Sequence, residues 1–185
     1  MTGQASDGAH HPIVVLVGNP GSGKTTAGKA LAKLLDVPFR DTDRDVEAET
    51  GTSVSDIFIQ KGEQQFRALE RAAVRTAIAE HDGVLALGGG AVLDPETREQ
   101  LRREVVVYLK VGLAAARQRL HMNRSRPLLV GNVRGRWQQL ANDREPLYLE
   151  VATFTVDTDH RTTQEVAHDI AAHLARDFDP KPDQE

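Results

Sequence analysis

Short apolar runs alternate along this chain with longer stretches in which apolar residues recur every three or four positions. The short runs have the length of buried strands, and the longer pattern is typical of helices with one apolar face. We therefore predict strands over residues 13–17, 37–40, 84–87, 105–109 and 153–157, and helices over 24–35, 43–50, 54–61, 64–81, 95–103, 112–122, 134–149 and 162–177.

The predicted strands are apolar at nearly every position, as in "IVVLV" and "VVVYL". Strands that are apolar on both faces and alternate with helices are typical of a parallel sheet covered on both sides. The chain is thus predicted to be α/β, with a doubly wound, five-stranded parallel sheet and helices on both faces. In such folds ligands bind beyond the carboxyl ends of the strands.

The pattern also predicts the domain organisation. Residues 12–178 are expected to form a single domain between a polar, disordered leader (1–11) and a similar tail (179–185). One interval, about 121–136, is rich in arginine and glycine and carries only a small apolar cluster. We predict that it is a mobile lid.

Composition narrows the classes of function. The 185 residues include no cysteine, which excludes disulfides and thiolate metal sites and fits a reducing cytoplasm. The net charge of −4 argues against a nucleic-acid partner, and no apolar stretch is long enough for a membrane span. Arginine outnumbers lysine by 17 to 6, which indicates either anionic small-molecule ligands or genomic base composition. We expect a cytoplasmic protein, by default a monomer.

The segment "GNPGSGKT" (18–25) follows the first predicted strand and opens the first predicted helix. Glycines at this spacing let backbone N–H groups surround a phosphate at a helix N-terminus. Lys24 is expected to reach the β- and γ-phosphates, and Thr25 to place its hydroxyl on Mg²⁺. The residues expected to bind ATP here are Gly21, Ser22, Gly23, Lys24, Thr25 and Thr26.

Other features restrict the kind of nucleotide-binding protein. No asparagine is followed by lysine, so the guanine-reading N-K-x-D sequence of GTPases is absent. What remains is a compact kinase of a small metabolite. Asp41 and Asp43, at the end of the second strand, would project from the same side of an extended segment. One would then serve the magnesium ion and the other the acceptor hydroxyl; alternatively, Asp43 merely caps the next helix.

Six segments in this order, "GNPGSGKT", "DTD", "FRALE", "LGGGAV", "RPLL" and "REPLY", give the chain a clear resemblance to shikimate kinase. The resemblance extends over residues 13–175, nearly the whole predicted domain. It implies phosphorylation of the 3-hydroxyl of shikimate by ATP with Mg²⁺, giving 3-phosphoshikimate and ADP. It also implies a place in the route to chorismate and the aromatic amino acids.

The resemblance further implies roles for single residues. Asp43 would contact the shikimate hydroxyls and act as base or positioning group, and Asp41 would lie near the metal. Arg67 and Arg144 would grip the carboxylate. The catalytic set would be Asp43, Lys24 and Arg126, the last as a lid arginine that also contacts ATP, while Arg161 would contact adenine. Gly88, Gly89 and Gly90 would line the shikimate pocket.

Each of these arginines also has a purely structural interpretation. Arg67 could be solvated or pair with Glu70, and Arg144 could pair with Glu145 or cap a helix end. Arg126 could be a surface residue of the lid. Trp137 is expected to be a packing residue, and Arg119 is the favoured further candidate for nucleotide binding.

The three glycines allow a similar choice. Either they form a slack turn, or side chains are absent so that the backbone can approach the acceptor. On the second interpretation, Gly89→Ala should harm shikimate binding alone. Two other functions stay open: phosphorylation of another polyol or sugar acid, gluconate above all, and a catalytically silent nucleotide-binding module.

Overall fold

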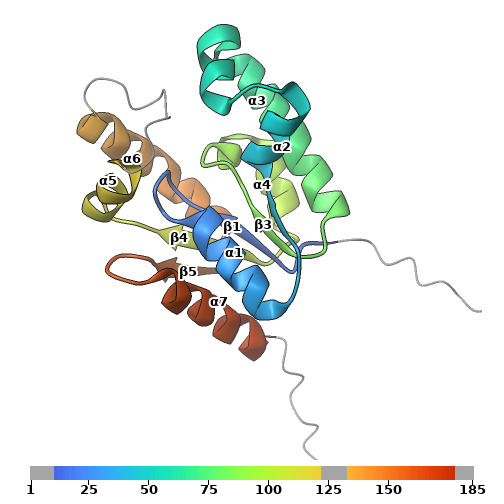
Figure 1. Cartoon of the computed structure of the whole chain (residues 1–185), viewed down its shortest axis with the longest axis vertical. Helices are drawn as coiled ribbons and strands as arrows, with labels where there is room; N and C mark the ends of the chain where they lie inside the picture. The colour runs from blue at the N-terminus through green and yellow to red at the C-terminus, as the bar shows by residue number, and fades with distance from the viewer. Residues whose placement is uncertain (1–10, 122–132, 178–185) are drawn as a thin grey trace, which may run out of the picture.

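A computed structural model describes residues 11–121 and 133–177 (Figure 1). It confirms the predicted α/β fold with a five-stranded, wholly parallel sheet in the order β2-β3-β1-β4-β5. The strands are β1 (Val14–Val17), β2 (Phe39–Asp41), β3 (Val84–Ala86), β4 (Val106–Lys110) and β5 (Phe154–Asp157). Because the chain leaves β1 toward one side of the sheet and later returns to its other side, the loop after β1 lies at a switch point, where such sheets bind ligands.

The helices are α1 (Lys24–Leu35), α2 (Thr42–Thr50), α3 (Val54–Glu80), η1 (Ala91–Leu93, a 3-10 turn), α4 (Pro95–Leu101), α5 (Leu113–His121), α6 (Val133–Val151) and α7 (Thr163–Asp177). None of the helices in the described ranges is both long and apolar enough for a membrane crossing.

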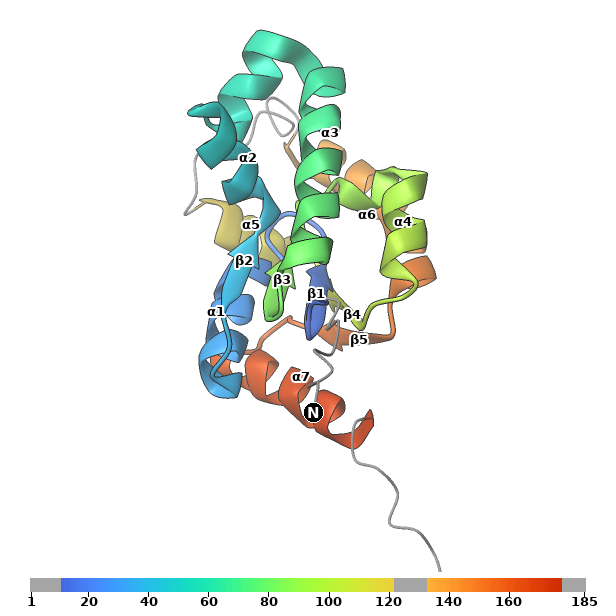
Figure 2. The same cartoon turned by 90° about the vertical axis from the view of Figure 1, so that its right-hand side faces the viewer.

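Alternate residues of the strands face two separate cores. Val14 and Leu16 of β1 pack with α1 and α7, whereas Val15 and Val17 pack with α3, α4 and α6. Figure 2 shows α1 and α4 on opposite sides of the strands. This arrangement explains why the inner strands β1 and β3 are apolar at every position, because each of their side chains meets a helix whichever way it points.

Beyond one end of the sheet lie α2 and the first half of α3 (Figures 1 and 2). They share a small apolar cluster that includes Val46, Ile57 and Phe66. Two helices were predicted over 54–61 and 64–81; the structure joins them into α3, with non-helical backbone at Gly62 (φ 81°, ψ 168°). The predicted break is therefore a kink within one assigned helix.

Two boundaries near the candidate site differ from the predictions. Strand β2 extends to Asp41, and α2 begins at Thr42 because the side chain of Asp41 caps it. The predicted lid lies mostly outside the described residues, which resume at Val133 with the first turn of α6. Arg126 is among the residues that are not described.

Candidate active site

The phosphate loop, residues 18–25, connects β1 to α1 as predicted. Gly18, Gly21 and Gly23 have positive φ, a backbone conformation that side-chain-bearing residues rarely adopt. Gly23 precedes α1 without a side-chain cap, so the first N–H groups of the helix face the loop. Lys24 folds back over the loop and donates from Nζ to the carbonyls of Gly18 at 2.7 Å and Asn19 at 3.3 Å. The loop therefore has the form of an anion cradle with a cation across it.

The end of β2 meets the start of α1 at this cradle. Thr25 donates from Oγ1 to Oδ2 of Asp41 at 2.8 Å, and the other carboxylate oxygen of Asp41 accepts from the backbone N–H of Asp43 at 3.1 Å. Asp41, and not Asp43, is thus the cap of α2. The predicted extended pair of aspartates is wrong, because Asp43 already belongs to the first helical turn.

Both aspartates nevertheless face one space. A cavity of about 230 Å³ is bordered by the phosphate loop, by Asp41 and Asp43, and by Gly89 and Arg119. The helical turn between the two aspartates sends them to different places along this cavity: Asp41 lies beside Thr25, and Asp43 lies against Gly88. The structure therefore places one acid, Asp41, beside the phosphate loop and the other, Asp43, beside Gly88.

We call Gly88–Gly90 the glycine loop; it follows β3. None of these three glycines has a positive φ, so the backbone conformation does not require glycine here. The atoms packed against the loop do require it at two positions. A Cβ atom at Gly88 would lie 2.5 Å from Oδ1 of Asp43 and 2.6 Å from Oε1 of Glu70, and one at Gly90 would overlap the guanidinium of Arg67. The slack-turn interpretation therefore fails, because charged side chains lie directly against this backbone.

The backbone groups of the glycine loop are held from several sides. The N–H of Gly88 donates to Oγ1 of Thr42 at 3.1 Å, and its carbonyl accepts from the N–H of Ala91 at 3.0 Å. The carbonyl of Gly89 accepts from the hydroxyl of Tyr148 at 2.6 Å. Within the described ranges, the N–H groups of Gly89 and Gly90 have no hydrogen-bond acceptor. These two donors are available to a ligand.

Arg67, on α3, pairs with Glu70 at 2.6 Å and with Glu63 at 3.1 Å. The pairing with Glu70 matches the structural interpretation, yet the same guanidinium also lies against Gly90. Burial raises the pKa of Glu70 above its ordinary value; Asp43 raises it further, while Arg67 and Arg144 lower it. A cluster of opposite charges, with an acid at its buried centre, therefore borders the glycine loop.

Arg144, on α6, is buried and donates from Nη1 to the carbonyl of Gly89 at 3.1 Å. The alternative in which Arg144 pairs with Glu145 is wrong, because Glu145 pairs with Lys110 of β4 at 2.8 Å. The Nε atom of Arg144 has no hydrogen-bond partner among the described residues. A buried guanidinium with an unused donor is suited to a carboxylate ligand.

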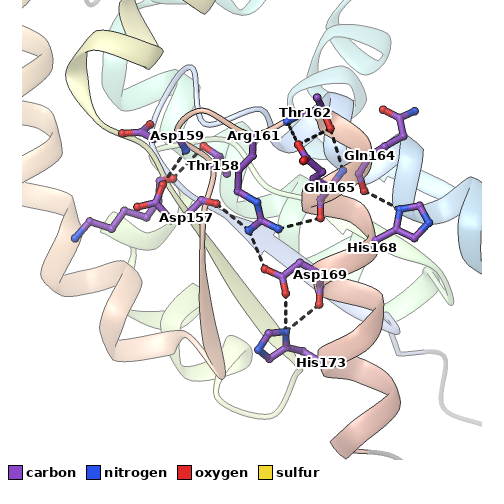
Figure 3. A network of polar contacts seen from close by, with 11 residues as sticks. Asp157, Thr158, Asp159, Arg161, Thr162, Gln164, Glu165, His168, Asp169 and His173 are labelled. Atoms are coloured by element: carbon purple, nitrogen blue, oxygen red, sulfur yellow. Dashed lines mark hydrogen bonds and ion pairs between the residues drawn. The ribbon is translucent and has the colours of Figure 1, made fainter.

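A second cavity, of about 180 Å³, also borders the phosphate loop and is lined by Arg119 and Arg161. Arg119 donates to the carbonyl of Gly21 at 3.2 Å and to that of Thr158 at 2.6 Å. Arg161 is held by Asp169 at 2.8 Å, within a polar network at the start of α7 (Figure 3). The structure thus brings both arginines, distant in sequence, to the phosphate loop.

Sequence reasoning gave no role to three residues that hold the site together. Thr42 and Tyr148 each bond the backbone of the glycine loop, and Glu70 was considered only as a structural partner of Arg67. A signal was present for two of them: Thr42 lies between the two aspartates, and Tyr148 ends the segment "REPLY". Trp137 packs as expected, but it also donates to the carbonyl of Pro20 at 3.1 Å.

Comparisons with known proteins agree on one family. A family model described as Shikimate kinase matches residues 20–175. A shikimate kinase of Salinispora tropica is 55% identical over 163 residues, which cover 88% of this chain and 98% of that relative. The solved structure of a shikimate kinase from Acinetobacter baumannii in complex with shikimate matches with a TM-score of 0.87 at 36% identity, covering 91% of this chain and 95% of that one.

A gluconokinase structure from Sinorhizobium meliloti also matches, with a TM-score of 0.62 at 21% identity over 91% of this chain and 93% of that one. This likeness concerns the fold alone.

Proposed function

This chain belongs to the shikimate kinase family, and on that premise we propose that it transfers the γ-phosphoryl group of ATP to the 3-hydroxyl of shikimate. The products would be 3-phosphoshikimate and ADP, on the route to chorismate. The observation that carries the proposal is that the phosphate loop, Asp43 and Gly89 of the glycine loop border the same cavity. A phosphate donor and a hydroxylated acceptor would meet in that cavity.

The acceptor side supports shikimate in particular. Shikimate carries one carboxylate and three hydroxyls, and a planar carboxylate is matched by guanidinium groups. Arg144 offers an unused, buried Nε, and Arg67 lies across the glycine loop from it. The free N–H groups of Gly89 and Gly90 would add donors for ligand oxygens. Hydrogen bonds to a charged group contribute about 1.5–3 kcal/mol each, so the two arginines would dominate acceptor binding.

We further propose that Thr25 and Asp41 hold Mg²⁺ with the phosphates of ATP. The donor set fits, because the two side chains present a hydroxyl and a carboxylate 2.8 Å apart. Magnesium prefers oxygen ligands and is usually held by one or two protein groups, with phosphates and water filling the other positions. When bound, the ion would neutralise charge on the phosphates.

In the proposed mechanism the chain contributes position and charge, since phosphoryl transfer needs little covalent help from a protein. Asp43 would orient the acceptor hydroxyl and receive its proton. Lys24, already across the phosphate loop, would stabilise charge on the transferred group. Arg126 would add charge from the lid; this role rests on the resemblance, because the residue lies outside the described ranges. Arg161, with Arg119 beside it, would border the adenine.

The test is ADP release by the purified protein with ATP and Mg²⁺, with shikimate and gluconate supplied in parallel. We expect release that depends on shikimate and is at least about a hundredfold slower with gluconate, because sites built to pair specific polar groups reject poorly matched ligands strongly. Release with gluconate alone would identify the rival kinase. ATP binding without release with either acid would identify the silent module. The monomeric state, the cytoplasmic location and the lid stay predictions.

A further inference from the structure

Helix α6 contacts both the phosphate loop and the glycine loop, and two of the side chains that make these contacts have no part in the proposed chemistry. Trp137, near the start of the helix, donates to Pro20 in the phosphate loop at 3.1 Å. Tyr148, near its end, lies with its hydroxyl 2.6 Å from the carbonyl of Gly89 and 3.4 Å from Oδ1 of Asn19. One phenol oxygen thus lies between the two loops.

The side chain of Tyr148 is completely buried and stacks on Tyr108, with ring centroids 5.0 Å apart. Burial raises the pKa of Tyr148, so the hydroxyl keeps its proton at neutral pH. A phenol has one proton to donate, and the shorter distance assigns it to Gly89. Oδ1 of Asn19, at 3.4 Å, is a second and weaker acceptor of the same hydroxyl, so one phenol connects Asn19 with Gly89.

Each end of this link reaches a group of the proposed reaction. The carbonyl of Asn19 accepts from Lys24 at 3.3 Å and from the N–H of Ser22 at 3.1 Å. The carbonyl of Gly89 also accepts from Arg144. The loops are in close contact beside the link as well, since a Cβ atom at Gly89 would lie 3.3 Å from the carbonyl oxygen of Gly18. A shift of Tyr148 would therefore change the distance between the donor loop and the acceptor loop.

We propose that Tyr148 is a positioning residue for phosphoryl transfer, whose hydroxyl fixes the glycine loop against the phosphate loop. This inference rests on the proposed function. Phosphoryl transfer requires the attacking oxygen and the phosphorus to be aligned at close range, and a misplacement of about 1 Å can cost about a hundredfold in rate. Binding of each substrate alone requires no such alignment. The hydroxyl should therefore matter more for the chemical step than for either affinity.

The structure offers a matched control. Tyr108 is buried beside Tyr148, but its hydroxyl has no hydrogen-bond partner among the described residues. Tyr108→Phe and Tyr148→Phe thus remove the same atom from stacked rings, and only the second breaks the link. Since Gly89 keeps its bond to Arg144, Tyr148→Phe should fold, with a Tm lower by about 2–4 °C.

The experiment measures single-turnover formation of 3-phosphoshikimate by rapid quench, with enzyme in excess over shikimate. Titration calorimetry gives Kd for shikimate and for ADP. We expect Tyr148→Phe to slow the single turnover by about 10- to 100-fold, with each Kd changed less than about threefold. Tyr108→Phe should stay within about twofold of the wild type in all three measurements.

A single-turnover rate within twofold of wild type for Tyr148→Phe overturns the inference, as does a loss matched by equal losses in both affinities. Should Tyr148→Phe fail to fold, Asn19→Ala breaks the other end of the link and decides by the same measurements. A wild-type protein that forms no 3-phosphoshikimate contradicts the proposed function itself, an outcome distinct from equal rates in wild type and variant.

Discussion

The phosphate loop and the glycine loop both follow strands of the same sheet, and both are rich in glycine, but the structure requires glycine for different reasons. Gly18, Gly21 and Gly23 have positive φ, so the course of the backbone itself demands them. In the glycine loop φ is not positive, and charged side chains lie where the Cβ atoms of Gly88 and Gly90 would be. The first loop is shaped to surround a ligand with its backbone, and the second leaves room for the side chains of other elements.

This contrast implies that equivalent substitutions in the two loops should affect different substrates. Changes in the phosphate loop should weaken ATP binding through backbone strain. Changes at Gly88 or Gly90 should displace Asp43, Glu70 or Arg67 and so weaken the proposed acceptor site.

Asp43→Asn should impair the reaction without favouring either loop, because on the proposed mechanism this side chain serves the step that joins the two substrates. We expect kcat to fall by about 10²–10⁴-fold, the usual contribution of a positioned general base. The Kd for ADP should change less than twofold, because Asp41 and Thr25, not Asp43, contact each other at the phosphate end. Steady-state kinetics and calorimetry measure the two quantities. An active variant would remove Asp43 from its proposed role.

Gly90→Ala should raise KM for shikimate by about 10- to 100-fold, because the new methyl group would overlap the guanidinium of Arg67 and displace it from the carboxylate that we propose it binds. The KM for ATP should stay within about twofold, since the phosphate loop does not contact this position. Kinetics with each substrate varied in turn measure this difference. Equal increases in both values would contradict a purely acceptor-side role for Gly90.

Gly21→Ala should show the reverse preference. The backbone at Gly21 has φ 85°, and an added Cβ would also lie 3.0 Å from the carbonyl oxygen of Ala116. Strain of this kind costs about 1–3 kcal/mol, so we expect KM for ATP to rise by about tenfold. The KM for shikimate should hardly change. If shikimate binding weakened as much as ATP binding, the strain would be spreading across both loops.

Gly89→Ala should change KM least of these variants, and it tests most directly whether the glycine loop and the phosphate loop act separately. The sequence alone predicted a loss of shikimate binding only. In the structure, an added Cβ would lie 3.3 Å from both the carbonyl oxygen of Gly18 and Cδ of Pro20, which belong to the phosphate loop. We therefore expect KM to rise by about two- to fivefold for both substrates, less than one kcal/mol each. A rise for shikimate alone would restore the sequence-based prediction.

Local sequence patterns were sufficient for the fold and for the phosphate loop. The short strand patterns between helical stretches predicted all five strands within one or two residues. The pattern was strongest for β1 and β3, which are wholly apolar because both faces of this sheet are covered. The positions near Asp41 were less predictable. Either of two aspartates separated by one residue can cap a helix, and only the geometry at the end of β2 makes Asp41 the cap and leaves Asp43 to the cavity.

The sequence by itself determined the alternation of strands and helices, the nucleotide-binding loop and the family, because each depends on residues a few positions apart or on the order of motifs. Only the tertiary structure decided which partner each charged or hydroxyl side chain has. Arg144 bonds Gly89, 55 positions away, instead of its neighbour Glu145, and Tyr148 reaches Asn19, 129 positions away. Such contacts arise only when the sheet orders β1 beside β3 and α6 packs across both loops.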